Sequence, residues 1–165
     1  MRTLILMRHA KAVRPDEADT DRARGLTGRG RCEAAEAGAA LYAHGVEPDL
    51  ALASTAARTR ETASIALEGR GLETRFQEAL YNAGADTLWD MFMAQTAERV
   101  LIVGHNPALG ELAAHFVTAA WDGSALARQI QSGFPTSAWA AFEIDGDVLE
   151  APCARLIAAW RPERN

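Results

Sequence analysis

Four side chains in this sequence have the chemistry to bind and transfer a phosphoryl group. They are two histidines, His9 and His105, and two arginines, Arg8 and Arg58, and each follows a short apolar segment closely. Guanidinium groups pair with phosphate oxygens through charge-assisted hydrogen bonds, and a neutral imidazole can attack phosphorus near pH 7. If the fold gathers these four side chains, we expect a pocket for a tetrahedral, doubly charged anion. That chemistry requires no metal ion.

The apolar segments that precede these side chains are typical of buried strands. They cover residues 4–7, 50–53 and 100–103, and patterns typical of helices separate them. This alternation predicts the α/β class: a three-layer α/β/α sandwich with a mostly parallel central sheet. Ligands bind beyond the carboxyl ends of the strands in such sheets. We therefore expect the four side chains to converge on one site.

Capping patterns and apolar periodicity predict the other elements. Thr27 is expected to cap a helix that ends near His44, Ser54 to cap the next helix, and Asn106 to cap a later helix with Pro107 at its first position. We also expect a strand over residues 74–76, a helix over 88–93 and two closing antiparallel strands within 137–144 and 154–160, whereas residues 118–133 give no clear pattern.

Composition excludes several classes of protein. A length of 165 residues suits a single domain, which we expect to span residues 1–165. The formal net charge of −5 and the pI near 5.4 argue against a nucleic acid or an anionic membrane as partner. No apolar run approaches the roughly 18 residues of a membrane helix, and no secretory signal pattern is present. We expect a cytoplasmic monomer without a cofactor.

Other residues that could do chemistry have simpler interpretations. Cys32 and Cys153 lie far apart in apolar surroundings, so we expect buried free thiols. The acidic stretch DEADTDRAR, residues 16–24, predicts a solvated loop rather than a metal site, because nothing fixes the geometry of its carboxylates. Lys11 and Arg14 could either guide an anionic substrate or solvate this loop, and the sequence does not decide between the two.

Three motifs, LMRHAKA, STAARTRETA and VGHNP, occur in this order across most of the chain. In this order and spacing they resemble the histidine phosphatase superfamily, the phosphoglycerate-mutase-like group. The segments RHAK, RGLTGRG and FPTS are similar to its SixA-type phosphohistidine phosphatases. The resemblance implies that His9 is the nucleophile that becomes phosphorylated, that Arg8 and Arg58 hold the phosphate, and that His105 is the second histidine of the pocket. The motif spacing selects Arg58 over its neighbour Arg60.

The resemblance also implies roles for Arg24 and Glu78, and a role for Asn106 follows from its position at the start of a helix. Arg24 in RGLT matches an arginine that reaches the phosphate region, and the amide of Asn106 is expected near the phosphate. Family members that cleave phosphoesters use a carboxylate to protonate the leaving oxygen, and Glu78 in QEALY matches its position. An imidazole leaving group needs such an acid less, because a phosphoramidate nitrogen can already carry a proton. The short segment 79–99 leaves no room for a lid, which predicts an open site.

These observations predict a metal-independent phosphatase that works through a phosphohistidine intermediate on His9. The expected substrate is phosphohistidine on a partner protein, because an open pocket suits a phosphoryl group displayed on a protein surface. One alternative is a phosphomonoesterase that acts on a small phosphorylated metabolite and depends on Glu78. An alternative of another class is a phosphate-recognition module without turnover, although such a module has little use for a nucleophilic imidazole.

Overall fold

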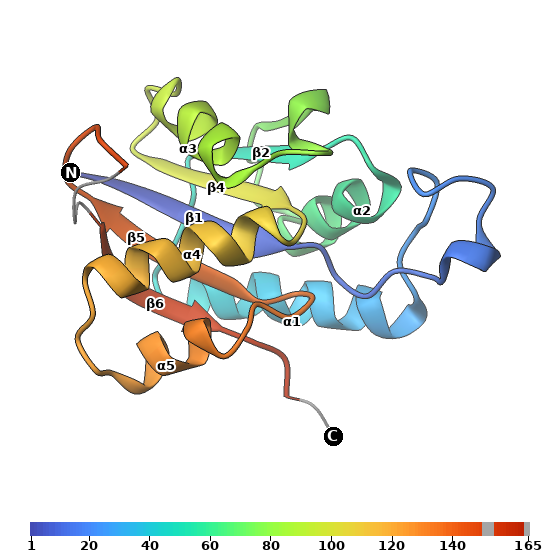
Figure 1. Ribbon diagram of the computed structural model, residues 1–165. Coiled ribbons are helices and arrows are strands. Elements are labelled where there is room, and N and C mark those ends of the chain that lie inside the picture. The colour runs from blue at the N-terminus through green and yellow to red at the C-terminus, as the bar shows by residue number, and fades with distance from the viewer. Residues whose placement is uncertain (150–153, 164–165) are drawn as a thin grey trace.

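The computed structural model describes residues 1–149 and 154–163 and places a six-stranded sheet at its centre (Figure 1). The strand order is β3-β2-β4-β1-β5-β6. Neighbours are parallel from β3 to β1, whereas β5 is antiparallel to both β1 and β6, so the predicted mostly parallel sheet is confirmed. The strands are β1 (Arg2–Arg8), β2 (Leu50–Ser54), β3 (Thr74–Gln77), β4 (Arg99–Gly104), β5 (Trp139–Ile144) and β6 (Ala154–Trp160).

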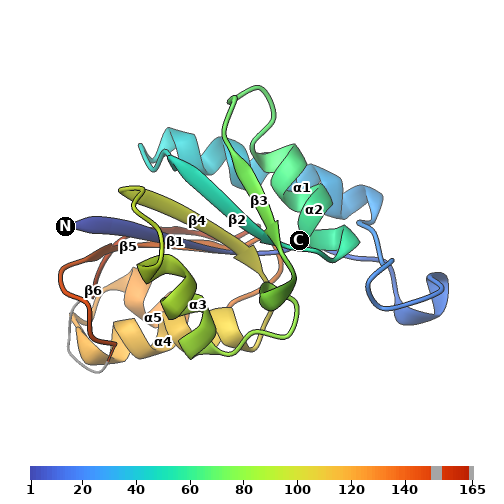
Figure 2. The same cartoon turned by 90° about the horizontal axis from the view of Figure 1, so that it is seen from above.

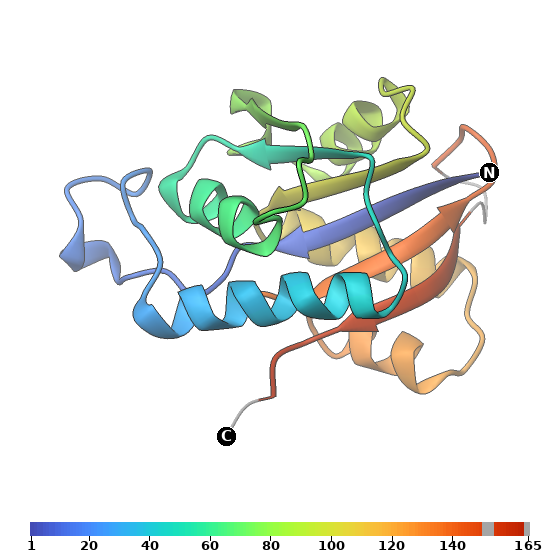
Figure 3. The same cartoon turned by 180° about the vertical axis from the view of Figure 1, so that it is seen from behind.

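Helices cover both faces of this sheet, as the predicted three-layer sandwich requires. Seen from above, α1 and α2 lie on one side of the strands and α3, α4 and α5 on the other (Figure 2). The view from behind shows α1 and α2 in front of the sheet (Figure 3). The helices are α1 (Gly28–Ala43), α2 (Ala57–Ala66), α3 (Ala85–Met93), α4 (Ala108–Ala119) and α5 (Ala125–Gln131), with short 3-10 helices at η1 (Pro15–Glu17) and η2 (Glu78–Leu80).

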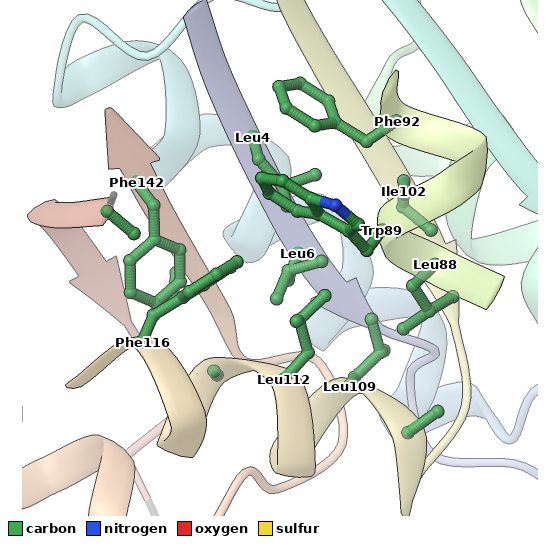
Figure 4. Close-up of a cluster of buried hydrophobic side chains, with 14 of the residues drawn as sticks. Leu4, Leu6, Leu88, Trp89, Phe92, Ile102, Leu109, Leu112, Phe116 and Phe142 are labelled. Carbon is green, nitrogen blue, oxygen red and sulfur yellow. The ribbon is translucent and has the colours of Figure 1, made fainter. Parts of the chain in front are cut away.

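The central strands are buried on both faces because successive side chains point to opposite layers. In β1, Leu4 and Leu6 belong to the cluster formed with α3, α4 and α5, which Figure 4 draws in close-up. Ile5 and Met7 belong to the cluster formed with α1 and α2. All four side chains are fully buried. The apolar run therefore needs no alternation with polar residues, which is why the sequence predicts this strand well.

Glycines allow two close approaches that fix α1. A Cβ built on Gly38 would lie 2.2 Å from the carbonyl oxygen of Ala66, so the missing side chain lets α1 and α2 touch through their backbones. A Cβ on Gly30 would lie 2.1 Å from the carbonyl oxygen of Lys11, which follows β1. The same end of α1 is capped as predicted, because the Thr27 hydroxyl accepts a hydrogen bond from the Gly30 amide. The helix thereby supports the segment directly after β1.

Several local expectations are wrong. The residue at the N-cap of α2 is Ala56, and the N-cap of α4 is Pro107, one residue later than expected. Ser54 and Asn106 instead use their side chains in the site described below. Cys32 is exposed on α1, where the outer face of the helix meets solvent, and Cys153 lies outside the described residues. The unassigned region 118–133 contains the end of α4 and the whole of α5.

No helix within residues 1–149 and 154–163 combines the length and the apolar character needed to cross a membrane.

Candidate active site

A cavity of about 270 Å³ lies where β1, β2 and β4 end, at the carboxyl edge of the parallel strands. It has the position that the topology predicts for a ligand site. Six of the seven predicted site residues line it, and Glu78 does not. The lining residues are Arg8, His9, Asp21, Arg24, Arg58, Tyr81, Asn82, His105 and Asn106.

His9 is the most buried titratable side chain of this cavity after Arg58. Its Nδ1 lies 2.7 Å from the carbonyl oxygen of Ala10, and because a carbonyl only accepts, Nδ1 carries the proton. Burial lowers the pKa of His9 to about 3, with smaller contributions from the neighbouring positive groups. The imidazole is therefore neutral at pH 7, with the lone pair on Nε2. Those are the properties that a nucleophilic imidazole requires.

The second histidine is tied to a buried serine. The Nε2 atom of His105 lies 2.8 Å from the hydroxyl oxygen of Ser54, which is fully buried at the end of β2. The same oxygen accepts a hydrogen bond of 3.3 Å from the Ala56 amide, so its own proton is available to the imidazole. The rings of His9 and His105 are 5.3 Å apart. Burial, together with nearby Arg58, lowers the pKa of His105 to about 4.

Arg58 enters the cavity from the first turn of α2 and is almost completely buried. Its Nη1 donates to the Asp21 carbonyl oxygen at 2.8 Å, and its Nη2 donates to the Asp21 carboxylate at 3.1 Å. Arg24 donates to the other carboxylate oxygen at 3.0 Å, and the Tyr81 hydroxyl donates to the one that Arg58 contacts. These donors keep the pKa of Asp21 well below its usual range, the Tyr81 hydroxyl most of all.

Arg8 and Asn106 share one acceptor on the opposite wall. The Nη1 of Arg8 and the Nδ2 of Asn106 both donate to the carbonyl oxygen of Phe134, at 3.1 and 2.8 Å. The Oδ1 of Asn106 accepts from the Gly110 amide inside the first turn of α4. Asn106, which precedes α4, thus joins the first turn of this helix to the segment FPTS while its side chain lines the cavity.

Glu78 lies outside the cavity and is held by other groups. Its carboxylate accepts hydrogen bonds from both terminal nitrogens of Arg22 and from the Thr55 hydroxyl, the latter at 2.6 Å. These hydrogen bonds, that of Arg22 most of all, lower the pKa of Glu78 to about 2 although the side chain is exposed. The carboxylate is therefore ionised at neutral pH. In this arrangement it has no proton to donate.

Sequence reasoning missed four residues of this region. Ser54 was expected to be a cap, Asp21 to be solvated, and Tyr81 and Asn82 had no assigned role. The only sequence signal for Asp21 is its position three residues before Arg24. Within the described residues, no group of three or more histidines, cysteines, aspartates and glutamates is arranged to hold a metal ion.

A second cavity of about 600 Å³ adjoins the first. Arg8 and Asn106 line both, so the two cavities share a wall. Apolar rings and one further guanidinium supply much of the remaining surface. The other lining residues are Ser132, Gly133, Phe134, Pro135, Arg161, Pro162 and Glu163.

Comparisons with known proteins bear on this site. The family model of the histidine phosphatase superfamily (branch 1) matches residues 4–91, more than half of the chain. This chain belongs to that superfamily. An uncharacterised protein of Mycobacterium tuberculosis is 36% identical over 161 residues, which cover 94% of this chain and 99% of the relative. The similarity to this relative thus extends over nearly the whole length of both chains.

Solved structures show which members of the superfamily this chain resembles. A protein provisionally assigned as the phosphohistidine phosphatase SixA of Agrobacterium tumefaciens is 31% identical, with a TM-score of 0.80 and 98% of each chain covered. The α-ribazole phosphatase of Shigella flexneri shares the fold at 19% identity, with a TM-score of 0.65 and 94% and 95% covered. The predictions of a SixA-type histidine phosphatase, of its fold and of phosphatase activity are confirmed.

Proposed function

We propose that this phosphatase removes the phosphoryl group from phosphohistidine on a partner protein, without a metal ion, through a phosphohistidine intermediate on His9. The observation that carries this proposal is the state of His9. Its Nδ1 proton is fixed on the Ala10 carbonyl, its ring is neutral, and it lines a cavity together with three arginines. A neutral imidazole beside fixed positive charge is suited to attack phosphorus.

The reaction proceeds in two transfers. The Nε2 lone pair of His9 attacks phosphorus, and the bond between phosphorus and the leaving nitrogen breaks with its electron pair going to that nitrogen. Arg8 and Arg58 neutralise the charge on the transferring oxygens. Water then attacks the phosphorus on His9, and inorganic phosphate leaves as the Nε2 lone pair is restored. His105, whose ring centre lies 5.3 Å from that of His9, lines the same cavity beside the transferring group.

The position of Glu78 favours an imidazole over an alkoxide as the leaving group. An alkoxide must be protonated as it departs, and the carboxylate matched to that task is ionised and held by Arg22 and Thr55 outside the cavity. A phosphohistidine ring that carries a proton on its second nitrogen leaves as neutral imidazole without an external acid. The substrate class follows from this difference.

The adjoining cavity supports a protein substrate. It shares Arg8 and Asn106 with the cavity of about 270 Å³ that contains His9, called the phosphate cavity below. Its volume of about 600 Å³ gives room for the side chain and backbone around a phosphorylated residue. Phe134, Pro135 and Pro162 supply apolar surface, while Arg161 supplies positive charge. A polypeptide that carries the phosphoryl group can occupy this surface while phosphorus lies next to His9.

The test compares phosphate release from a phosphohistidine protein and from p-nitrophenyl phosphate, both in the presence of EDTA. The expected result is faster release from the phosphohistidine protein, with a trapped phosphoenzyme that the His9→Ala variant lacks. Circular dichroism of the variant verifies its fold. Turnover that survives in His9→Ala, or that EDTA abolishes, would contradict the proposal.

Two matched outcomes identify the alternatives. A small-metabolite phosphomonoesterase would cleave the ester faster and would lose that activity steeply in Glu78→Gln, whereas we expect phosphohistidine turnover in this variant to stay within about threefold. A phosphate-recognition module would bind inorganic phosphate tightly and release none from either substrate.

A further inference from the structure

The carboxylate that lines the phosphate cavity is Asp21, and its placement needs a functional explanation. Three donors from different parts of the chain hold it there: Arg24, Arg58 and Tyr81. Its own backbone carbonyl accepts a further hydrogen bond from Arg58. A negative side chain within a cavity built for a dianion weakens phosphate binding by repulsion. A favourable contact of this carboxylate with a substrate must therefore involve a part other than the phosphoryl group.

Asp21 has room for one more partner. Its two oxygens offer about four acceptor positions, and the three side-chain donors occupy three of them. Among residues 1–149 and 154–163, Arg24 alone donates to Oδ1, so one position remains on this oxygen. The side chain is half exposed, so this position is open to a substrate that enters from solvent. A cationic N–H is the strongest donor for such a site.

An acid role for Asp21 does not fit the same contacts. Two guanidinium groups and a phenol hydroxyl all stabilise the ionised carboxylate, and they keep its pKa low. A group held in this way stays unprotonated at neutral pH. It accepts a hydrogen bond throughout the reaction and transfers no proton.

We propose that Asp21 is a specificity-determining residue that binds the proton-bearing nitrogen of a cationic leaving group, which for the substrate proposed above is the imidazolium ring of phosphohistidine. This inference rests on the proposed function and names what recognises its leaving group. As the bond between phosphorus and nitrogen breaks, its electron pair returns to the ring and the second nitrogen keeps its proton. The ring departs as neutral imidazole. Until the bond breaks, the hydrogen bond to Asp21 stabilises the cationic, protonated ring of the bound substrate.

Tyr81 helps to hold the Asp21 carboxylate in place. Its hydroxyl donates to Asp21, its ring meets the edge of His105 with centres 5.7 Å apart, and the Arg22 guanidinium lies 4.0 Å from its ring centre. Through Arg22, the same wall is joined to Glu78. The ion pair that removes Glu78 from the cavity thus also braces the residue that orients Asp21.

The experiment measures kcat/KM of wild type and Asp21→Asn on N-phosphohistidine and on p-nitrophenyl phosphate at pH 7. Asparagine keeps the size of the side chain and removes its charge. We expect the rate on N-phosphohistidine to fall about tenfold or more, the effect of losing a hydrogen bond to a charged group. The rate on p-nitrophenyl phosphate should rise, because its leaving group is anionic and no longer faces a carboxylate.

The matched control is Asp19→Asn, two residues earlier in the same loop. Asp19 is exposed and does not line the cavity, so both rates should stay within twofold of wild type. Inhibition by inorganic phosphate supplies a second measurement. It should strengthen in Asp21→Asn, since a repelling charge is removed while Arg8 and Arg58 remain.

The outcomes separate this inference from the proposed function. The preference of the wild-type enzyme between the two substrates tests the proposed function. The change of that preference in Asp21→Asn tests the role of Asp21, whichever substrate the wild type prefers. An equal fall on both substrates, together with weaker inhibition by phosphate, would mean that Asp21 only positions Arg58 and would overturn the inference. An unchanged preference would overturn it too.

Discussion

Gly38→Ala should destabilise the protein although alanine is the better helix former. The new Cβ would lie 2.2 Å from the Ala66 carbonyl oxygen and 2.7 Å from the Ala66 Cα, both backbone atoms of α2. Cβ atoms essentially never lie closer than 3.0 Å to a non-bonded heavy atom, so the two helices must separate by most of an ångström. Overpacking of this kind costs about 1–3 kcal/mol, and a backbone neighbour that cannot rotate away puts Gly38 at the upper end.

The gain in helix propensity offsets about 1 kcal/mol of that cost, which leaves a loss of about 2 kcal/mol in the free energy of unfolding. For a chain of this size the loss corresponds to a fall in Tm of about 4–8 °C. The matched control is Gly28→Ala at the start of the same helix, where a Cβ meets no atom within 4 Å. We expect this variant to be as stable as wild type. Urea unfolding of both variants is the assay, and equal stability of the two would refute the packing argument.

Further predictions concern the site. Burial lowers the pKa of His9 to about 3 in the folded state, so the unfolded chain binds more protons as the pH falls through 6.5. Between pH 6.5 and 5, wild type should therefore lose about 1.5 kcal/mol more unfolding free energy than His9→Ala, measured by urea titration. Arg58→Lys should lower kcat/KM at least a hundredfold, because an ammonium cannot make both contacts to Asp21. The control is Arg60→Lys, at an exposed residue stacked on Phe76, and its kcat/KM should stay within twofold of wild type. Ser54→Ala should lower kcat about tenfold with little change in KM, because His105 loses its partner; wild-type kcat would show that Ser54 does not position the ring.

The sheet and the edge at which Arg8, His9 and His105 lie could be predicted because local sequence determines them. Apolar runs that are buried on both faces leave few alternatives to parallel strands, and the topology then requires their carboxyl ends to meet. Arg8 is the last residue of β1, and His9 and His105 come directly after β1 and β4, so an error of one residue in a strand boundary still leaves them at the same edge. Whether these residues have the proposed catalytic roles stays a prediction until the variants are measured.

Local sequence could not predict what the serine and asparagine side chains do. Ser54 has the residue type and the position that are typical of a helix N-cap, and its hydroxyl does accept a hydrogen bond from the Ala56 amide. The same hydroxyl, however, also forms a hydrogen bond with Nε2 of His105, which lies 51 residues further along the chain. A contact of this kind depends on β2 and β4 being neighbours in the sheet. Only the register between the two strands brings the pair together, and no pattern within one segment contains that register.

Local sequence could not predict the surroundings of the Glu78 and Asp21 carboxylates either, and these surroundings matter more for function. Family resemblance selects Glu78 as the acid from its place in QEALY, but the charge that decides its state comes from Arg22, 56 residues earlier. The acidic stretch that contains Asp21 looks solvated because its sequence has no apolar anchor. The anchor is provided instead by Arg58, Arg24 and Tyr81, which reach it after folding. One loop supplies both Asp21, which lines the cavity, and Arg22, which holds Glu78 outside it. If Asp21 has the role proposed for it, we expect a change in this loop to alter leaving-group preference without any change at His9.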